Sequence, residues 1–238
     1  MKKLFDFVDE AFYINLDSRT DKKIFIEEHF SKMGISNFVK RSKGYSPSEL
    51  GFKLLDNGKY NGMDYTTCCF YSHLQIIKYA KEKKLENVLI FEDDALFYTE
   101  GDYNPIDQIY NGLQQIKQFP NWEVCYLGAD FGESIIELDL VAPNLIKLKR
   151  GGNANPACCF AMIIRHTIYD ELIDAFENKN EIMIDYYISL HIKEKYLIHK
   201  PSIFQRYGVI NDIGPNHYMG CPVDIWLEKR NKKLNYLF

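Results

Sequence analysis

The chain has 238 residues, of which 46% are hydrophobic and 26% are charged, and its formal net charge is −4. These proportions are typical of a globular protein with a substantial core, and they exclude disordered and fibrous classes. Acidic and basic residues are interspersed, so no continuous basic surface is available to a nucleic acid, and we expect no nucleic-acid partner.

Neither end of the sequence carries an export, retention or lipidation signal. Asp6, Asp9 and Glu10 interrupt the first residues before an apolar stretch of signal-peptide length can form. No apolar run approaches the roughly 18 residues that suggest a membrane span. We therefore expect a cytoplasmic protein without a transmembrane segment. The six cysteines lack the spacing of zinc or redox sites, and we expect free thiols, most of them buried.

The first part of the sequence alternates between strand and helix patterns. Residues 11–16 are a short run of β-formers, which predicts a buried strand. The apolar spacing after it predicts a helix with Ser18 or Thr20 as its N-cap, Asp21 in its first turn and Gly34 as its stop. Further along, the patterns predict a strand at 37–42, a loop over 44–62, a helix over 66–84 and a strand at 88–91.

The same alternation continues through the second half. Strands are predicted at residues 124–127, 145–149 and 159–164, and helices at 106–118 and 167–177. This order predicts the α/β class, with a mostly parallel, twisted sheet flanked by helices in a single domain over residues 1–238. Ligands of such sheets bind beyond the carboxyl ends of the strands.

Three consecutive acids, Glu92, Asp93 and Asp94, follow the predicted strand at 88–91. Carboxylates at a partly desolvated sheet end cost free energy unless a partner stabilises their charge. A hard cation such as Mn²⁺ or Mg²⁺ would stabilise it and would also bind a diphosphate. In an extended chain Glu92 and Asp94 would share one face and Asp93 would point the other way. Acids that merely cap a following loop or helix are the alternative; the strand before them favours the metal.

Residues 15–21 lie where the first strand passes into its helix. Backbone amides and Arg19 at such a position suit an anionic or nucleotide group. Taken alone, these residues fit helix capping by Ser18 and Asp21, with Arg19 on the surface, better than they fit a binding site.

Three motifs stand in a fixed order along the chain. They are FYINLDSR at residues 12–19, CFYSH at 69–73 and LIFEDDA at 89–95. Together they resemble glycosyltransferase family 25, which includes lipooligosaccharide galactosyltransferases and collagen galactosyltransferase-like enzymes. Residues 126–128, Asp185 and residues 201–205 also fall in the expected order. The resemblance covers residues 11–205, and order plus spacing make it more specific than any single motif.

This resemblance implies a glycosyltransferase-A type fold, with nucleotide binding in the half up to about residue 130 and the acceptor and catalytic half after it. It implies an enzyme that inverts the anomeric carbon while moving a hexose, such as galactose or glucose, from a uridine diphosphate sugar to a hydroxyl of a glycan or protein. Mn²⁺ or a similar ion would assist. The residues expected to bind the nucleotide sugar are Asn15, Leu16, Asp17, Arg19, Ser72, His73, Glu92, Asp93 and Gln205.

Metal ligation and proton transfer are assigned to individual side chains. Glu92 and Asp94 are the expected metal ligands, and His217 would complete the shell as an imidazole, although its Gly- and Pro-rich surroundings favour an ordinary loop histidine. An inverting transfer needs a base for the acceptor hydroxyl. Asp185 is the candidate, with Asp212 as the second choice and helix N-capping as the alternative role of Asp185.

Two other functions fit parts of this pattern. A catalytically silent module that binds a nucleotide sugar would keep the same fold. A metal-dependent phosphoryl or nucleotidyl transferase would also use paired carboxylates. The sequence has no Gly-rich phosphate loop ending in Lys and Ser or Thr, which argues against the second alternative.

Overall fold

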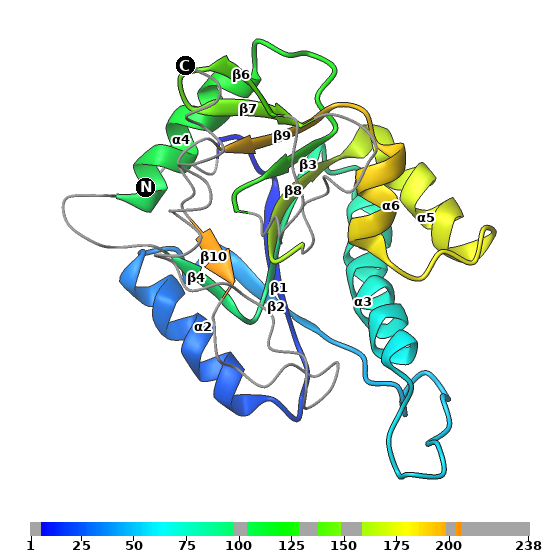
Figure 1. The fold of residues 1–238 in the computed structure, drawn as a ribbon. Helices are drawn as coiled ribbons and strands as arrows, with labels where there is room; N and C mark the ends of the chain where they lie inside the picture. Colours follow the sequence, from blue (N-terminus) through cyan, green and yellow to red (C-terminus); the bar gives the residue numbers. More distant parts are fainter. Residues whose placement is uncertain (1–5, 98–103, 129–137, 149–158, 199–202, 206–238) are drawn as a thin grey trace.

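The computed structural model describes residues 6–97, 104–128, 138–148, 159–198 and 203–205 (Figure 1). These residues form an eight-stranded sheet with helices on both faces and a separate two-stranded ribbon. The helices are α2 (Thr20–Lys32), α3 (Gly62–Glu82), α4 (Pro105–Ile116), α5 (Tyr169–Glu177) and α6 (Ile184–His191), with a 3-10 helix at His166–Ile168. The strands are β1 (Glu10–Asn15), β2 (Val39–Lys43), β3 (Asn87–Glu92), β4 (Ala95–Phe97), β5 (Val124–Tyr126), β6 (Leu138–Ala142), β7 (Leu145–Leu148), β8 (Ala161–Arg165), β9 (Lys195–Ile198) and β10 (Ile203–Gln205).

The strand order in the sheet is β2-β1-β3-β8-β5-β9-β7-β6. β1 pairs in parallel with both β2 and β3, and β5 pairs in parallel with β9. β8 is antiparallel to β3 and β5, while β7 is antiparallel to β9 and β6. Only β7 and β8 of the eight strands therefore run against the rest, which confirms the predicted α/β class with a mostly parallel sheet. Because β8 lies between β3 and β5, the two predicted halves of the chain share one sheet.

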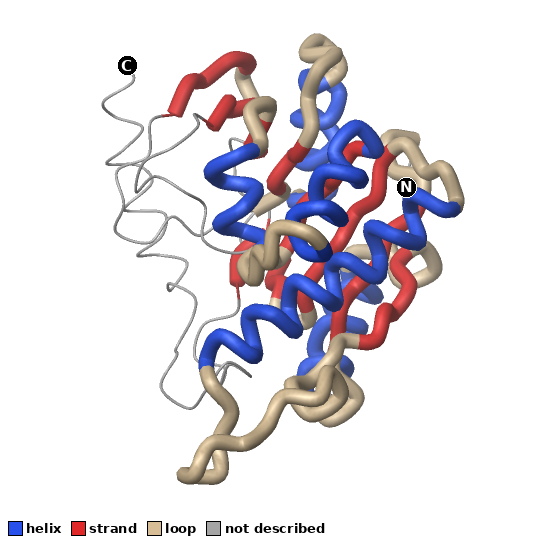
Figure 2. The backbone as a smooth tube through the Cα atoms, turned by 90° about the vertical axis from the view of Figure 1, so that its right-hand side faces the viewer, coloured by secondary structure: helices blue, strands red, loops and turns tan. Residues whose placement is uncertain are grey.

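Each face of the sheet has its own hydrophobic core, because successive side chains of a strand point to opposite faces. In β3, Leu89 and Phe91 belong to the core that includes α2 and α4, whereas Val88 and Ile90 belong to the core that includes α3, α5 and α6. Figure 2 shows helices lying over the strands on one of these faces. Burial on both faces explains why β3 is a continuous apolar run, which ends where Glu92 meets the sheet edge.

The prediction for the C-terminal end of α2 is confirmed, and the prediction for its N-terminal end is wrong. The helix stops before Gly34, whose φ of 70° is the left-handed conformation that a stop glycine adopts, so this prediction is confirmed. The predicted capping by Ser18 or Thr20 is wrong. Arg19 occupies the N-cap position and makes no capping bond, because its side chain has no acceptor and instead pairs with Asp21.

α3 begins earlier than the predicted residue 66, because a reciprocal cap forms before it. Asn61 Oδ1 accepts a hydrogen bond from the Met63 amide, and Asp64 Oδ2 accepts one from the Asn61 amide. Residues 44–61 form turns without a strand or helix, as predicted, and they extend from the start of α3 away from the sheet (Figure 1).

The sequence patterns do not predict β4, β6, β9 or β10. β4 and β10 have three residues each, which is too short to show a period. β9 begins with the charged Lys195, which leaves only the short apolar run at 196–198. This lysine is 1% exposed, and its ammonium donates to the carbonyl oxygens of Ser189 at 2.6 Å and Ile192 at 2.7 Å. Buried charge is tolerated there because its donors are satisfied.

Two minor expectations concern cysteines and membrane spans. Cys68, Cys69, Cys125 and Cys159 are free thiols and all but Cys69 are buried, as expected; the other two cysteines lie outside the described residues. None of the helices in the described ranges combines the length and apolar character needed to cross a lipid bilayer.

Gly128 follows β5 at a point where β10 passes very close. A Cβ at this position would lie 1.8 Å from the carbonyl oxygen of Ile203 and 2.9 Å from Phe160 Cε2. The backbone would have to move, so we expect Gly128→Ala to lower the free energy of unfolding by about 3 kcal/mol. Gly62→Ala is the control, since a Cβ there meets nothing within 4 Å, and its effect should stay below about 0.5 kcal/mol. Urea denaturation compares them; equal stabilities would contradict the close approach.

Candidate active site

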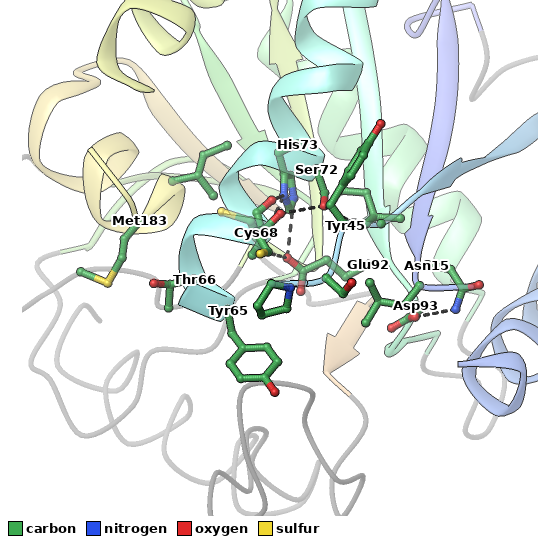
Figure 3. A pocket seen from close by; sticks show the side chains of 18 of the residues that line it. Asn15, Tyr45, Tyr65, Thr66, Cys68, Ser72, His73, Glu92, Asp93 and Met183 are labelled. Atoms are coloured by element: carbon green, nitrogen blue, oxygen red, sulfur yellow. Dashed lines mark hydrogen bonds and ion pairs between the residues drawn. The ribbon is translucent and has the colours of Figure 1, made fainter. Parts of the chain in front are cut away.

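A cavity of about 540 Å³ lies beyond the carboxyl ends of β1 and β3 (Figure 3). β1 contributes Ile14 and Asn15, and β3 contributes its last residue, Glu92. The first half of α3, the start of α6 and the segment 44–47 complete the walls. The parallel pairing of β1 with β3 brings their ends to one edge of the sheet, which is where a ligand is predicted to bind.

Residues 92–94, here called the acidic turn, form one end of this cavity. β3 ends at Glu92, and Asp93 and Asp94 make the turn into β4. All three residues line the cavity. Glu92 contacts α3 and Asp93 contacts α2, which lie on opposite faces of the sheet, so the predicted alternation is confirmed for these two residues.

Asp93 is anchored by partners from β1 and α2. Asn15 Nδ2 donates to Asp93 Oδ2 at 2.7 Å (Figure 3), and Lys22 Nζ lies 3.4 Å from Asp93 Oδ1. Lys22 is 3% exposed and Asp93 is 8% exposed, so this ion pair is buried. Asn15 is itself held, because Nδ2 also donates to the Arg19 carbonyl at 3.0 Å and Oδ1 accepts from Arg41 Nε at 3.1 Å. The first strand and helix therefore fix the position of the acidic turn.

Glu92 is crowded by other carboxylates. Burial, followed by the charges of Asp94, Asp93 and Asp185, raises the pKa of Glu92 to about 8, and Lys22 opposes this shift only weakly. Without a cation Glu92 therefore keeps its proton up to about pH 8, which is the condition expected where carboxylates repel one another.

The acidic turn has donors that suit Mn²⁺ or Mg²⁺. These ions prefer carboxylate oxygens, and Glu92 and Asp94 both line the cavity. The raised pKa of Glu92 reflects burial first and then repulsion by the neighbouring carboxylates, and a bound cation would offset both. The residues present thus fit the expected ion, and their assignment as its ligands stays a prediction.

Ser72 connects α3 to the loop that walls the cavity. Its hydroxyl donates to the Cys68 carbonyl at 2.7 Å and accepts from the Tyr45 amide at 3.0 Å. Tyr45 packs edge-to-face against Tyr71, with ring centroids 4.9 Å apart. Ser72 lines the cavity as well, but both of its hydrogen bonds hold the protein together, and its predicted contact with the donor stays a prediction.

His73 is fully buried one helical turn after Cys69. His73 Nδ1 lies 3.0 Å from the Cys69 carbonyl oxygen, and because a carbonyl can only accept, this nitrogen carries the proton. Burial lowers the pKa of His73 to about 4, although the carbonyls of Cys69 and Cys159 act in the opposite direction. Burial and the nearby Glu92 also raise the pKa of the Cys69 thiol well above its usual value. The imidazole and the thiol are therefore both neutral at physiological pH.

Asp185 lies in the first turn of α6 and lines the same cavity. Met183 is the N-cap of this helix, so the alternative role of Asp185 as the N-cap is wrong. Asp185 Oδ1 accepts from the Tyr186 amide at 2.8 Å. Its charge contributes to the raised pKa of Glu92, which means that the predicted base lies within electrostatic reach of the acidic turn.

Not every predicted nucleotide-binding residue lines the cavity. Asn15 and Leu16 do, together with residues 92 and 93, but Asp17 and Arg19 do not. Asp17 Oδ1 accepts from Arg41 Nη2 at 2.6 Å, and Arg19 donates twice to the Asp21 carboxylate, at 2.8 and 2.9 Å. Both are thus engaged in surface ion pairs, and their predicted contact with a nucleotide stays untested.

Three predicted residues cannot be placed in full. His217 and Asp212 lie outside the described residues. Gln205 is described by its backbone, which pairs with Ala95 in the ribbon of β10 and β4. β10 therefore runs beside the strand that follows the acidic turn, while the side chain of Gln205 is outside the description.

Sequence reasoning missed Lys22 and two aromatic residues of the cavity, Tyr45 and Tyr65, here called the aromatic wall. Lys22 stands four residues before Ile26, on the stripe that α2 buries, and a lysine on an apolar stripe is a readable sign of a buried carboxylate partner. Tyr45 and Tyr65 also line the cavity. They come from the predicted loop and the start of α3, where the sequence offers no periodic signal.

Comparison with known proteins supports the predicted family for part of the chain. Residues 8–119, just under half of the chain, match the family model described as glycosyltransferase family 25 (LPS biosynthesis protein). This match confirms the predicted family resemblance over these residues and the prediction of a glycosyltransferase. No individual curated protein matches the chain.

Several solved structures are distantly similar in shape. A197 from STIV is 11% identical, with 85% of this chain and 86% of that chain covered and a TM-score of 0.42. UDP-glucose pyrophosphorylase complexed with UDP-glucose is 12% identical, with 95% and 81% covered and a TM-score of 0.44. A glycosyltransferase involved in the glycosylation of the major capsid of PBCV-1 is 10% identical, with 75% and 72% covered and a TM-score of 0.39. The proposed donor, acceptor and metal therefore rest on the residues of the cavity and not on these structures.

The raised pKa of Glu92 predicts a pH-dependent stability of the metal-free protein. Between its ordinary pKa of 4.5 and the folded value of about 8, the folded chain holds a proton that the unfolded chain has lost, so the free energy of unfolding falls as pH rises through this window. Glu92→Gln should remove that fall, leaving the variant similar to the parent at about pH 5 and about 2–4 kcal/mol more stable at about pH 9. Urea denaturation with a chelator tests this.

The control for this pH experiment is Glu28→Gln, which changes an exposed glutamate of α2. Its stability should follow that of the parent at every pH. Parallel pH profiles for the parent and Glu92→Gln would show that the acidic turn does not perturb Glu92.

The buried pair of Lys22 and Asp93 predicts a strong effect of a single substitution. Lys22→Met would leave the Asp93 carboxylate buried without its cation, so we expect a loss of about 3–5 kcal/mol in the free energy of unfolding at neutral pH. Lys23→Met is the matched control, because Lys23 is 42% exposed and pairs with Glu27 at 4.0 Å, and it should cost less than about 1 kcal/mol. Thermal or urea denaturation at neutral pH measures both; comparable losses would refute the buried pair.

Proposed function

We propose that this chain is a metal-dependent, inverting glycosyltransferase of the glycosyltransferase-A type, which moves a hexose from a uridine diphosphate sugar to a hydroxyl of a glycan or protein. The observation that carries this proposal is the acidic turn, which lies at one end of a cavity inside the segment that matches the family model. Asp185 lines the same cavity from a different element, so an acceptor base and a diphosphate site are available in one space.

The acidic turn is proposed as the diphosphate end. Asp94 and Glu92 would hold Mn²⁺ or Mg²⁺, which would stabilise the charge of the departing diphosphate. Asp93 is committed to Lys22 and Asn15, so its contribution is to orient the turn. A buried ion pair at this position keeps the carboxylates in place before any ligand arrives.

The aromatic wall is proposed as the contact for the uracil or the sugar. Tyr45 and Tyr65 line the cavity, and aromatic faces stack well on both kinds of ring. Tyr45 is held by its backbone bond to Ser72 and by its ring contact with Tyr71. A wall fixed in this way loses little side-chain freedom when a ligand binds.

Asp185 is proposed as the base that takes the proton of the acceptor hydroxyl. It is half-buried in the first turn of α6 and lines the cavity that the acidic turn also lines. We expect Asp185→Asn to abolish transfer while binding of UDP-galactose or UDP-glucose, measured by calorimetry, stays close to that of the parent. Near-normal turnover by this variant would refute the assignment.

Hydrolysis of the donor tests the function without knowledge of the acceptor. With Mn²⁺ and either UDP-galactose or UDP-glucose, we expect slow release of UDP that stops when the metal is chelated. Asp94→Asn should slow this release by about 100-fold, because one carboxylate facing the leaving group is lost. Asp107→Asn, on the exposed side of α4, is the control and should leave the rate unchanged.

Two results would overturn the proposal. Binding of the UDP-sugar without turnover, with any acceptor and any divalent metal, would favour the silent binding module. Release of inorganic phosphate or pyrophosphate in place of UDP would favour the phosphoryl or nucleotidyl transferase.

A further inference from the structure

Three side chains of different chemistry converge on one wall of the cavity. Cys69 and His73 are one turn apart on α3, so both face β3, and Glu92 meets them from the end of that strand. His73 Nε2 lies 3.6 Å from Glu92 Oε1 (Figure 3). Cys69 Sγ lies 3.7 Å from the same oxygen. One nitrogen, one sulfur and one oxygen atom from these residues all lie within 4.8 Å of one another.

The imidazole nitrogen that faces Glu92 forms no hydrogen bond with the described residues. His73 is 0% exposed, and its Nδ1 carries the proton that it shares with the Cys69 carbonyl. Nε2 therefore presents a lone pair toward Glu92, and it makes no hydrogen bond within the structure as described. A buried acceptor left without a donor costs about 1–3 kcal/mol, so an unsatisfied lone pair at a cavity wall indicates a missing ligand.

We propose that Cys69, His73 and Glu92 bind a zinc ion. Zinc prefers nitrogen and sulfur donors, and it accepts a carboxylate as well. Bond lengths of zinc to sulfur, nitrogen and oxygen place the ligand atoms of a tetrahedral site about 3.4–3.6 Å apart. The two distances to Glu92 Oε1, 3.6 and 3.7 Å, already lie near these values. On binding, bonds from zinc to Cys69 Sγ and to a Glu92 oxygen replace the S–H and O–H bonds, and both protons pass to the buffer.

Three protein ligands leave the fourth position of a tetrahedral ion open. All three residues line the cavity, so this position faces the space where a substrate would lie. Sites of this kind hold water or a substrate oxygen, whereas structural zinc sites use four protein ligands. The zinc would thus contact a ligand of the cavity directly.

This site shares Glu92 with the Mn²⁺ or Mg²⁺ position of the proposed function, but its other donors are a sulfur and a nitrogen atom in place of the Asp94 carboxylate. Mn²⁺ and Mg²⁺ prefer oxygen ligands, whereas thiolate and imidazole select zinc strongly over both. The zinc site does not rest on the proposed function, since it requires neither a nucleotide nor transfer. Zinc binding and UDP release are separate measurements, and either can fail alone.

Metal binding by the full chain tests the proposal. After treatment with a chelator and dialysis against Zn²⁺, we expect one zinc per chain that an equal concentration of Mn²⁺ does not displace. Co²⁺ in place of Zn²⁺ should give the charge-transfer absorption of a thiolate ligand, and Zn²⁺ should protect Cys69 from alkylation. Both of these readouts use the unaltered chain, so they do not depend on the folding of a variant.

Variants assign the ligands. Cys69→Ser should weaken zinc binding on the order of 100-fold, since the sulfur donor is lost. Cys68→Ser is the matched control, because the neighbouring thiol also lines the cavity but lies outside the cluster, and its zinc affinity should equal that of the parent. Equal zinc binding by Cys69→Ser and the parent, or a Co²⁺ complex without thiolate absorption, would overturn the proposal.

Discussion

Carboxylates from two distant parts of the chain line one cavity at the carboxyl end of β3, and the cost of burying these like charges together is the constraint on which the site depends. β3 is buried on both faces, so its direction is fixed by packing, and the acids that follow must emerge at the sheet edge. Two features of the fold reduce this cost. Lys22 and Asn15 hold Asp93 as a buried anion, and Glu92 retains a proton. The negative charge of the site is only partly neutralised in this way, so the site favours the binding of cations.

Much of the fold is readable from the sequence because burial leaves a pattern. The double burial of β3 gives a continuous apolar run, and Gly34 marks the end of α2 through its positive φ. The pattern fails where local and long-range effects compete. β4 and β10 are stable only as a pair, so neither has a signal of its own, and the partners that allow Lys195 to be buried in β9 are the carbonyls around the end of α6. Such partners cannot be read from spacing.

The candidate site is readable only in part, for a related reason. The acids of residues 92–94 follow an apolar strand, so their place at the sheet edge can be inferred, but the turn that brings all three into one cavity cannot. Lys22 interrupts a helical apolar stripe and is in principle detectable. The approach of Glu92 to His73 depends on how α3 packs on β3, which is a tertiary fact. Sequence reasoning thus finds candidate groups, and packing decides which of them meet.

The ribbon of β4 and β10 has a consequence for how the protein is made. Ile203 pairs with Phe97, and Gln205 pairs with Ala95, so the strand that follows residues 92–94 pairs with a segment far later in the sequence. Short two-stranded ribbons do not persist alone in water, and closing a long loop is slow. Before residues 203–205 have been synthesised, a nascent chain can assemble the first βαβ unit, but the strand that follows the acidic turn still lacks its partner.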